Sequence, residues 1–116
     1  MQRRFRLRHA DDFARLRREG RAYRHDLMIL SLAPNGLSHN RYGTITSKRL
    51  GKAVTRNRTR RIIREVVRQL HPHLQTGFDV LIVARPPVVG QHFARILDTV
   101  SMLCRRSGLI VEGESS

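Results

Sequence analysis

Residues 48–68 read KRLGKAVTRNRTRRIIREVVR, and this stretch decides more about the 116-residue chain than any other. Nine of its 21 positions are Lys or Arg, and Glu65 is its one acid. From Thr55 onward the apolar residues recur with the period of a helix, at about 100° per residue. One face of this predicted helix carries Ile62, Ile63, Val66, Val67 and Leu70. A narrow stripe on the opposite face carries Asn57, Arg61, Arg64 and Arg68.

The cationic face of this helix is unusual because its charges repel one another. A solvated helix face normally mixes signs, so that residues four apart attract. Here Arg60, Arg61, Arg64 and Arg68 lie along one side with little acidic compensation. A bound polyanion would relieve that repulsion, and free N–H groups at the helix start add positive potential. The pattern therefore predicts a phosphate-binding helix; the alternative is a merely solvated face.

The net charge of +14 is concentrated in two separate stretches. Residues 1–24 contribute +6 and residues 48–68 contribute +8, whereas residues 25–47 and 69–116 are each neutral. A polyanion that contacts both stretches is therefore expected, and nucleic acid and anionic membrane are the two candidates.

Nucleic acid fits the sequence better than a membrane does. No run of roughly 18 apolar residues is present, and the Arg-rich N-terminal stretch lacks the apolar region of a signal peptide. An interfacial membrane helix favours Trp and Phe, whereas the basic helix offers Ile and Val. Cys104 is the single cysteine, which rules out an intramolecular disulfide and fits a reducing interior. A nucleic-acid partner in the cytoplasm is the expectation.

The N-terminal stretch is predicted to begin with a flexible basic arm, residues 1–10. A short helix is expected over residues 11–20, with Asp11 and Asp12 serving as N-cap and dipole partners. Gly20 suits the C-terminal stop of this helix.

Two extended segments are expected next. Residues 22–33 include the apolar run 27–32, which is typical of a central strand. A turn at residues 34–36 leads to a second strand near residues 41–47, and the two strands are predicted to form an antiparallel pair.

After the basic helix, a strand over residues 79–84 and a core-facing helix over residues 91–106 are expected, with a frayed tail at 108–116. The order αβββαβα predicts a single α/β (α+β) domain over residues 1–116. Its architecture is a two-layer sandwich with about four strands in a mixed sheet and three helices.

The chain shows no convincing catalytic or metal-binding constellation. The acids are scattered, and Glu65 is interpreted as a counter-charge among the arginines. His71 and His73 match no zinc pattern, and Cys104 is expected to fill core space. Among the few aromatic residues, Phe13 either stacks on nucleic-acid bases or anchors its helix to the sheet, and Tyr42 is a second stacking candidate.

Residues 47–65 resemble the RNR signature of the bacterial ribonuclease P protein component, with the basic pairs, Gly51 and Arg56-Asn57-Arg58 at the spacing of that family. Residues 6–8, 12–20 and 78–86 are similar to its arm, first helix and last strand. The likeness covers all but about the final ten residues.

The resemblance implies the protein subunit of an endoribonuclease whose RNA subunit carries the chemistry. That RNA removes the 5′ leader of precursor tRNA with Mg²⁺, while the protein binds the catalytic RNA and grips the leader. It also implies a left-handed βαβ crossover, no catalytic or metal-binding residue in the protein, no organic cofactor, no membrane and no obligate protein partner.

Site residues carry over from the family motif position by position. The RNA-binding residues implied are Lys48, Arg49, Lys52, Arg56, Asn57, Arg58, Arg60, Arg61, Arg64 and Arg68. The residues implied around a leader cleft are Phe13, Arg17, Ile29, Ser31, Lys48 and Arg49. Arg17 and Ser31 stand where aromatic residues occur in the family, which predicts weaker stacking and a more electrostatic grip.

Three other functions share part of this pattern. A ribosomal or general RNA-binding protein has the same charge distribution but no need of the spacing from Lys48 to Arg61. A DNA-binding regulator would require a helix-turn-helix. An autonomous metal-dependent nuclease would require a cluster of carboxylates.

Overall fold

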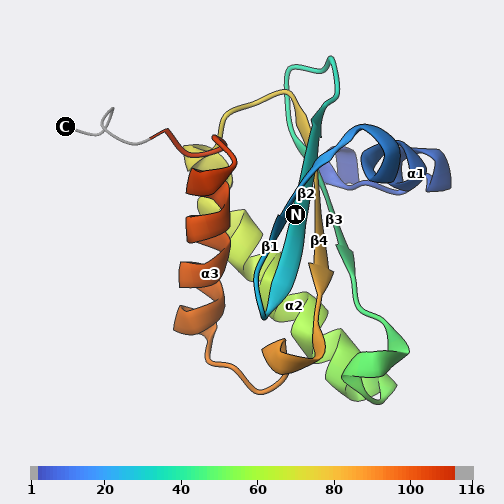
Figure 1. The fold of residues 1–116 in the computed structure, drawn as a ribbon, viewed down its shortest axis with the longest axis vertical. Helices are drawn as coiled ribbons and strands as arrows, with labels where there is room; N and C mark the ends of the chain where they lie inside the picture. The colour runs from blue at the N-terminus through green and yellow to red at the C-terminus, as the bar shows by residue number, and fades with distance from the viewer. Residues whose placement is uncertain (1–2, 112–116) are drawn as a thin grey trace.

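A computed structural model of the chain describes residues 3–111. Its helices are α1 (Ala10–Glu19), α2 (Ala53–Leu70) and α3 (Phe93–Arg106). Its strands are β1 (Arg21–Arg24), β2 (Met28–Pro34), β3 (Arg41–Ile45) and β4 (Phe78–Ala84). The predicted element order αβββαβα is confirmed for the described residues (Figure 1). The segment expected to be extended over 22–33 is a hairpin of two strands rather than one.

The sheet has the order β1-β2-β4-β3. β2 pairs antiparallel with both β1 and β4, and β3 runs parallel to β4. The predicted antiparallel pair of β2 and β3 is therefore wrong, because β4 lies between them. The turn after β2 opens into a longer connection that spans the start of β4. Within it, the Asn35 N–H donates to the Gly77 carbonyl at 2.9 Å, and the Phe78 N–H donates to Asn40 Oδ1 at 2.8 Å.

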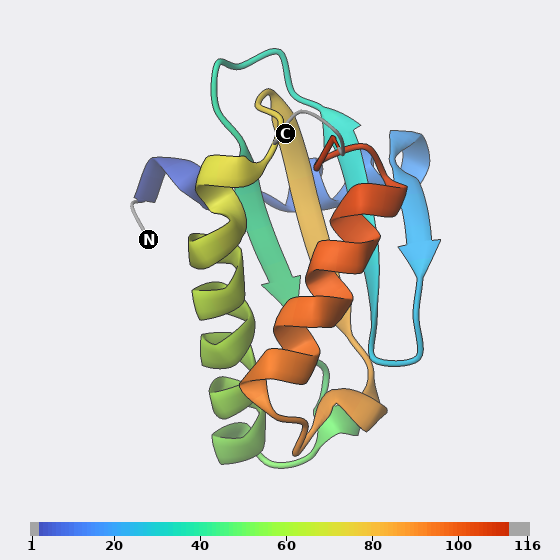
Figure 2. The same ribbon diagram turned by 90° about the vertical axis from the view of Figure 1, so that its left-hand side faces the viewer.

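The connection from β3 through α2 to β4 is left-handed, as the resemblance implied. In Figure 2 the helices face the viewer, both strands run downward and β4 lies to the right of β3. When the view is rotated so that both strands point upward, with α2 still in front of the sheet, β4 lies to the left of β3. Nearly all parallel crossovers move the other way.

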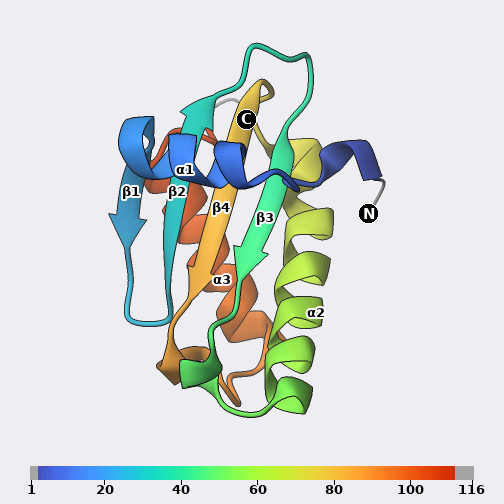
Figure 3. The ribbon, with the colours of Figure 1, turned by 90° about the vertical axis from the view of Figure 1, so that its right-hand side faces the viewer.

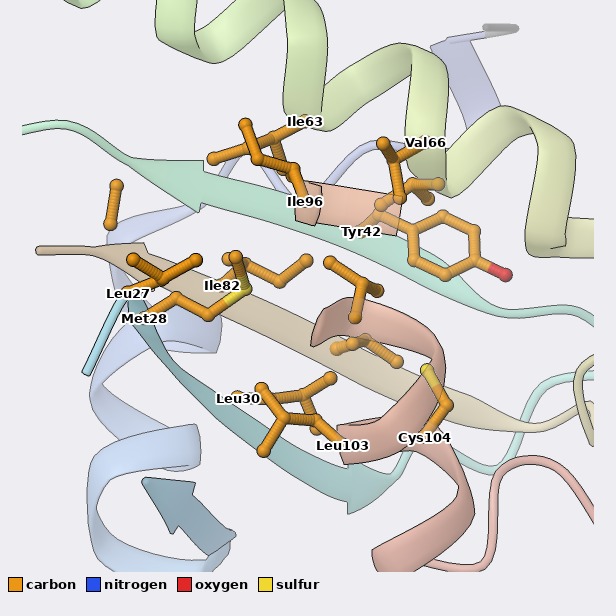
Figure 4. Packing of buried hydrophobic residues seen from close by; sticks show 14 of the residues in the cluster. Leu27, Met28, Leu30, Tyr42, Ile63, Val66, Ile82, Ile96, Leu103 and Cys104 are labelled. Carbon is orange, nitrogen blue, oxygen red and sulfur yellow. The ribbon is translucent and has the colours of Figure 1, made fainter. Parts of the chain in front are cut away.

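One face of the sheet packs under α2 and α3 to form the main core (Figure 4). Alternation along β2 sends Met28 and Leu30 into this core, where Ile63 of α2 and Leu103 of α3 meet them. The predicted apolar faces of both helices are confirmed. Cys104 lies in the same core, as expected, and burial raises its pKa to about 12.

Tyr42 also belongs to this core, so the prediction that it lies on a polar face available for base stacking is wrong. The Tyr42 hydroxyl bonds to Asn40 Nδ2 at 3.2 Å and to His71 Nδ1 at 2.7 Å. These partners satisfy the polar end of the ring and leave its apolar part to pack. Burial raises the Tyr42 pKa to about 12.

The opposite face of the sheet is covered only at one end, where α1 crosses it (Figure 3). Leu16 of α1 packs there with Leu7, Ala33 and Leu81. The helix begins at Ala10 with His9 as N-cap, so Asp11 and Asp12 lie in its first turn rather than at the cap.

Gly20 ends α1 in an extended conformation with φ −74°, not in the left-handed stop that was expected. Glycine is required there for another reason. A Cβ atom at this position would overlap the carbonyl oxygen of Leu16.

The two terminal stretches are more ordered than the sequence predicted. In the expected flexible arm, Leu7 is buried and its N–H donates to the Tyr42 carbonyl at 2.8 Å, while the Phe5 ring packs on His71. In the expected frayed tail, Leu109 is fully buried. Residues 1–2 and 112–116 of these two predictions lie outside the described range.

Candidate nucleic-acid interface

The outer face of α2 carries the stripe of polar and cationic side chains that the helical period predicted. Asn57, Arg61, Arg64 and Arg68 are all exposed on it. Lys52 and Arg58 are exposed near the start of α2, and Lys48 and Arg49 are exposed on a 3₁₀ turn (Lys48–Leu50) before it. Eight of the ten predicted RNA-binding residues thus point into solvent on one continuous segment.

The remaining two, Arg56 and Arg60, are half-buried. Arg60 is held in place, because its guanidinium donates to Asn57 Oδ1 at 3.0 Å and to Thr46 Oγ1 at 2.6 Å. The Nε atom of Arg56 is buried without a hydrogen-bond partner among the described residues. A buried donor left unpaired costs free energy.

Glu65 supplies the single counter-charge on α2, as predicted. Arg68 donates to both of its carboxylate oxygens, at 2.9 and 2.5 Å. The bonds from Arg68 hold the Glu65 pKa below its usual value. Both side chains are exposed, so this ion pair adds little stability and a phosphate can compete for Arg68.

A small pocket of about 150 Å³ lies between α2, β3 and the N-terminal segment. Arg6, Arg60 and Arg64 line it, together with Tyr42 and Thr44. Arg6 is not among the residues that the sequence predicted to bind RNA. The net positive charge of residues 1–24 predicted a second segment in contact with the polyanion, but it did not predict that this segment lies beside α2.

On the other face of the sheet, Asp79 is fully buried in an ionic network that the sequence did not predict. It accepts hydrogen bonds from Arg41 at 2.8 and 2.7 Å, from Asn35 at 3.0 Å and from Arg15 of α1. Arg41 also reaches Asp12 at 3.3 Å. This network ties α1 to β3 and β4 and thereby fixes the orientation of the helix.

The Asp79 pKa reflects two opposing causes. Burial raises it, but the hydrogen bonds from Arg41 and Asn35 and the charges of Arg41 and Arg15 outweigh burial and hold it below its usual value. Asp79 therefore stays ionised and is a structural carboxylate with its acceptor sites in use.

The residues predicted to surround a leader cleft come from β2, from α1 and from the 3₁₀ turn after β3, on or beside the face of the sheet that α1 crosses. Ile29 and Ser31 point to it from β2, half-buried. Phe13 is half-buried against Gly43 at the edge of α1, and Arg17 is exposed one turn later. Phe13 thus anchors α1 to the sheet while keeping part of its ring accessible.

Lys48 and Arg49 follow β3 at the open end of the face, whereas α1 crosses the other end (Figure 3). The predicted cationic border and the predicted aromatic border therefore lie at opposite ends of the open sheet surface.

Within residues 3–111, no group of three or more His, Cys, Asp or Glu side chains is placed to hold a metal ion. His71 bonds to Tyr42, and burial together with the charge of His39 lowers its pKa. No helix in this part of the chain is long and apolar enough to cross a membrane.

The basic helix and the fold have a counterpart in a known family. The family model for ribonuclease P matches residues 1–108 of this chain. The chain belongs to the ribonuclease P family. A ribonuclease P protein component from Roseiflexus sp. (strain RS-1) is 39% identical over 116 residues, which cover 99% of this chain and 95% of that relative.

Solved structures from the same family share the fold. The RNase P protein of Staphylococcus aureus superposes with a TM-score of 0.84 at 25% identity, over 91% of this chain and 97% of that one. The RNase P protein of Thermotoga maritima gives a TM-score of 0.81 at 26% identity, over 87% of this chain and 96% of that one. The four-stranded mixed sheet and three helices are therefore the architecture of this family.

Proposed function

We propose that this protein is the ribonuclease P subunit that binds the catalytic RNA and the 5′ leader of precursor tRNA in the cytoplasm. The observation that carries the proposal is an arginine stripe on α2, mostly without acidic partners, beside a half-open sheet face. Binding groups are abundant and no carboxylate cluster accompanies them in residues 3–111. This combination suits a protein whose RNA partner does the chemistry.

The catalytic RNA is assigned to the outer face of α2. Arg61 and Arg64 project from it, Arg60 is pre-oriented by Thr46, and Arg56 holds an unused buried donor. Guanidinium groups bind phosphate with paired donors, and a fixed helix presents several at regular intervals. Contacts of this kind supply affinity and register more than sequence specificity.

The leader is assigned to the open half of the sheet. Ile29 and Ser31 would form its floor, Phe13 and Arg17 one border, and Lys48 and Arg49 the other. In this floor Ile29 offers apolar contact to a base face and Ser31 a hydroxyl group, whereas the borders are mostly cationic and suit the backbone. With Arg17 and Ser31 in place of aromatic residues, the grip is mainly electrostatic.

Mg²⁺ is assigned to the RNA subunit. The donor set of the protein does not fit a resident Mg²⁺, because Asp79 is fully engaged by arginines and Glu65 by Arg68. The protein instead brings a net charge of +14 to a complex of two RNAs. Those cations would offset repulsion between the RNAs and lower the Mg²⁺ concentration required for cleavage.

The test is cleavage of a labelled precursor tRNA with a bacterial ribonuclease P RNA, with and without the protein, over a series of Mg²⁺ concentrations. We expect correct 5′ maturation at lower Mg²⁺ when the protein is present. An unchanged Mg²⁺ midpoint would overturn the proposal, and cleavage by the protein alone would indicate an autonomous nuclease.

Two variants make this test specific to the assigned surface. The double variant R61A/R64A should lose the stimulation, because it removes two exposed cations from the stripe. R95A is the matched control, since it removes an exposed cation from α3 and should retain the stimulation.

A further inference from the structure

A second hollow lies between the N-terminal ends of α2 and α3, away from the open sheet face. It is a groove of about 510 Å³. Both helices begin at the same end of the molecule, as Figure 2 shows at its lower edge. The groove wall includes apolar side chains from both helices and from the loop before α3, namely Val54, Ile62, Val89 and Phe93. Arg58 and His92 also line it.

Two apolar residues of this groove, Val54 and Val89, are exposed and are not explained by packing of the core. Val54 is 79% exposed and Val89 is 38% exposed, whereas Val88 and Ile96 at the back of the same groove are almost fully buried. Val54 also lies between Lys52 and Arg58, in the most basic part of the sequence. An exposed apolar notch inside a cationic surface indicates a ligand with an apolar part and an anionic part.

The charge around the groove favours a ligand that carries negative charge. None of the residues that line it is acidic, and neither α2 nor α3 carries an acid in its first turn. Helix starts of this kind add positive potential to that of Lys52 and Arg58. The groove is also continuous with the arginine stripe, because Arg58 precedes Arg61 on α2 by three residues.

We propose that this groove receives one unstacked nucleobase of the ribonuclease P RNA. The base would lie against Val54, Val89 and Phe93, and its neighbouring phosphates would contact Lys52 and Arg58. Proteins that read RNA commonly bind bases splayed out of a helix by apolar contact combined with cationic contacts to the backbone. This inference rests on the proposed function and adds a base-contacting site to an interface otherwise made of phosphate contacts.

The first experiment separates base contact from phosphate contact. The variant V54S/V89S removes apolar surface without changing charge, and the exposure of both residues makes unfolding an unimportant outcome. We expect about tenfold weaker binding to a bacterial ribonuclease P RNA, with an unchanged slope of log affinity against log salt. R58A should instead flatten that slope.

The matched control is L37S, because Leu37 is also an exposed apolar residue, at 42%, but lies in the connection between β2 and β3. It should bind the RNA like the wild type. Thermal unfolding of the wild type and of V54S/V89S, R58A and L37S checks that all four proteins are folded to the same extent. Equal affinity of V54S/V89S and L37S would overturn the proposal, as would a loss of affinity accompanied by a flatter salt slope.

A second measurement identifies what occupies the groove. Val89→p-benzoylphenylalanine should cross-link to a single site in the RNA, and Leu37→p-benzoylphenylalanine should not. Absence of a cross-link from position 89, or cross-linking from both positions alike, would contradict the assignment. If the wild-type protein did not bind this RNA at all, the proposed function would fail as well. If the wild type bound normally and changes in the groove did not alter binding, only this site would be overturned.

Discussion

The two faces of the sheet are made by the same strands and yet differ in nearly every physical property. The face under α2 and α3 is closed and apolar, with Leu30, Ile63 and Leu103 fully buried. The face under α1 holds a buried ionic network around Asp79 at one end and is open at the other. One face therefore forms the main core, whereas the other combines an ionic network with half-buried residues such as Ile29 and Ser31.

This difference in burial follows from the alternation of side chains along each strand. Successive side chains of a strand point to opposite faces, so neighbours in sequence serve different purposes. Leu30 is fully buried in the closed core, whereas Ile29 is half-buried on the open surface. Substitutions at adjacent positions can therefore test the two faces separately.

The largest effect on stability is expected from L30A, which removes a fully buried side chain from the closed face. Truncating a fully buried leucine removes its transfer free energy and leaves a cavity, so the free energy of unfolding should fall by about 3 kcal/mol. Urea unfolding followed by circular dichroism measures this. Under conditions where the variant remains folded, its affinity for ribonuclease P RNA should be unchanged; a parallel loss of affinity would mean that the faces are not separable.

D79N should have the next largest effect, because it disrupts the ionic network that holds α1 on the sheet. Asn keeps the shape but removes the charge that pairs with Arg41 and Arg15, so we expect a loss of about 2 kcal/mol, as for hydrogen bonds to a charged group. Because the folded pKa of Asp79 is depressed, its contribution is complete above the ordinary carboxyl range and is lost as pH falls through the folded value.

Unfolding of the wild type and D79N as a function of pH tests this explanation. The wild type should lose stability more steeply than D79N below about pH 4, the ordinary range of an aspartate. Equal pH dependence of the two proteins would show that the Asp79 charge does not hold α1 on the sheet.

The closed face was largely predictable from the sequence, because local periodicity reports burial. The spacing of Ile63, Val66 and Val67 predicted which side of α2 packs, and the apolar run in β2 predicted a central strand. The basic stripe could be predicted for the same reason, since Arg61 and Arg64 follow the same helical period.

The other face could not be predicted, because its order depends on contacts between residues distant in sequence. Asp79 and Arg41 are 38 positions apart, and Arg15 is 64 positions from Asp79. The insertion of β4 between β2 and β3 has the same origin, since strand order leaves no local trace. Leu7 was missed because a single apolar residue among arginines shows no period.

A smaller effect is expected from R61A, which tests whether the stripe binds phosphates. Removal of one phosphate contact should reduce the slope of log affinity against log salt by roughly 0.7–0.9 and weaken binding at every salt concentration. R64A and R68A should each behave alike. R95A is again the control, and an unchanged slope in R61A would mean that this arginine is merely solvated.

I29A should have the smallest effect, and it sharpens the contrast with L30A at the neighbouring position. Because Ile29 is half-buried, truncation should cost less than about 1 kcal/mol of unfolding free energy, as little apolar area returns to water. If the open sheet is the floor of the leader site, the same change removes contact to a leader base. The holoenzyme should then bind precursor tRNA about two- to fivefold more weakly and mature tRNA as before. Comparing the two affinities for the same variant cancels any general effect on folding or RNA assembly. A loss of affinity for both tRNAs, or for neither, would remove the leader from this face.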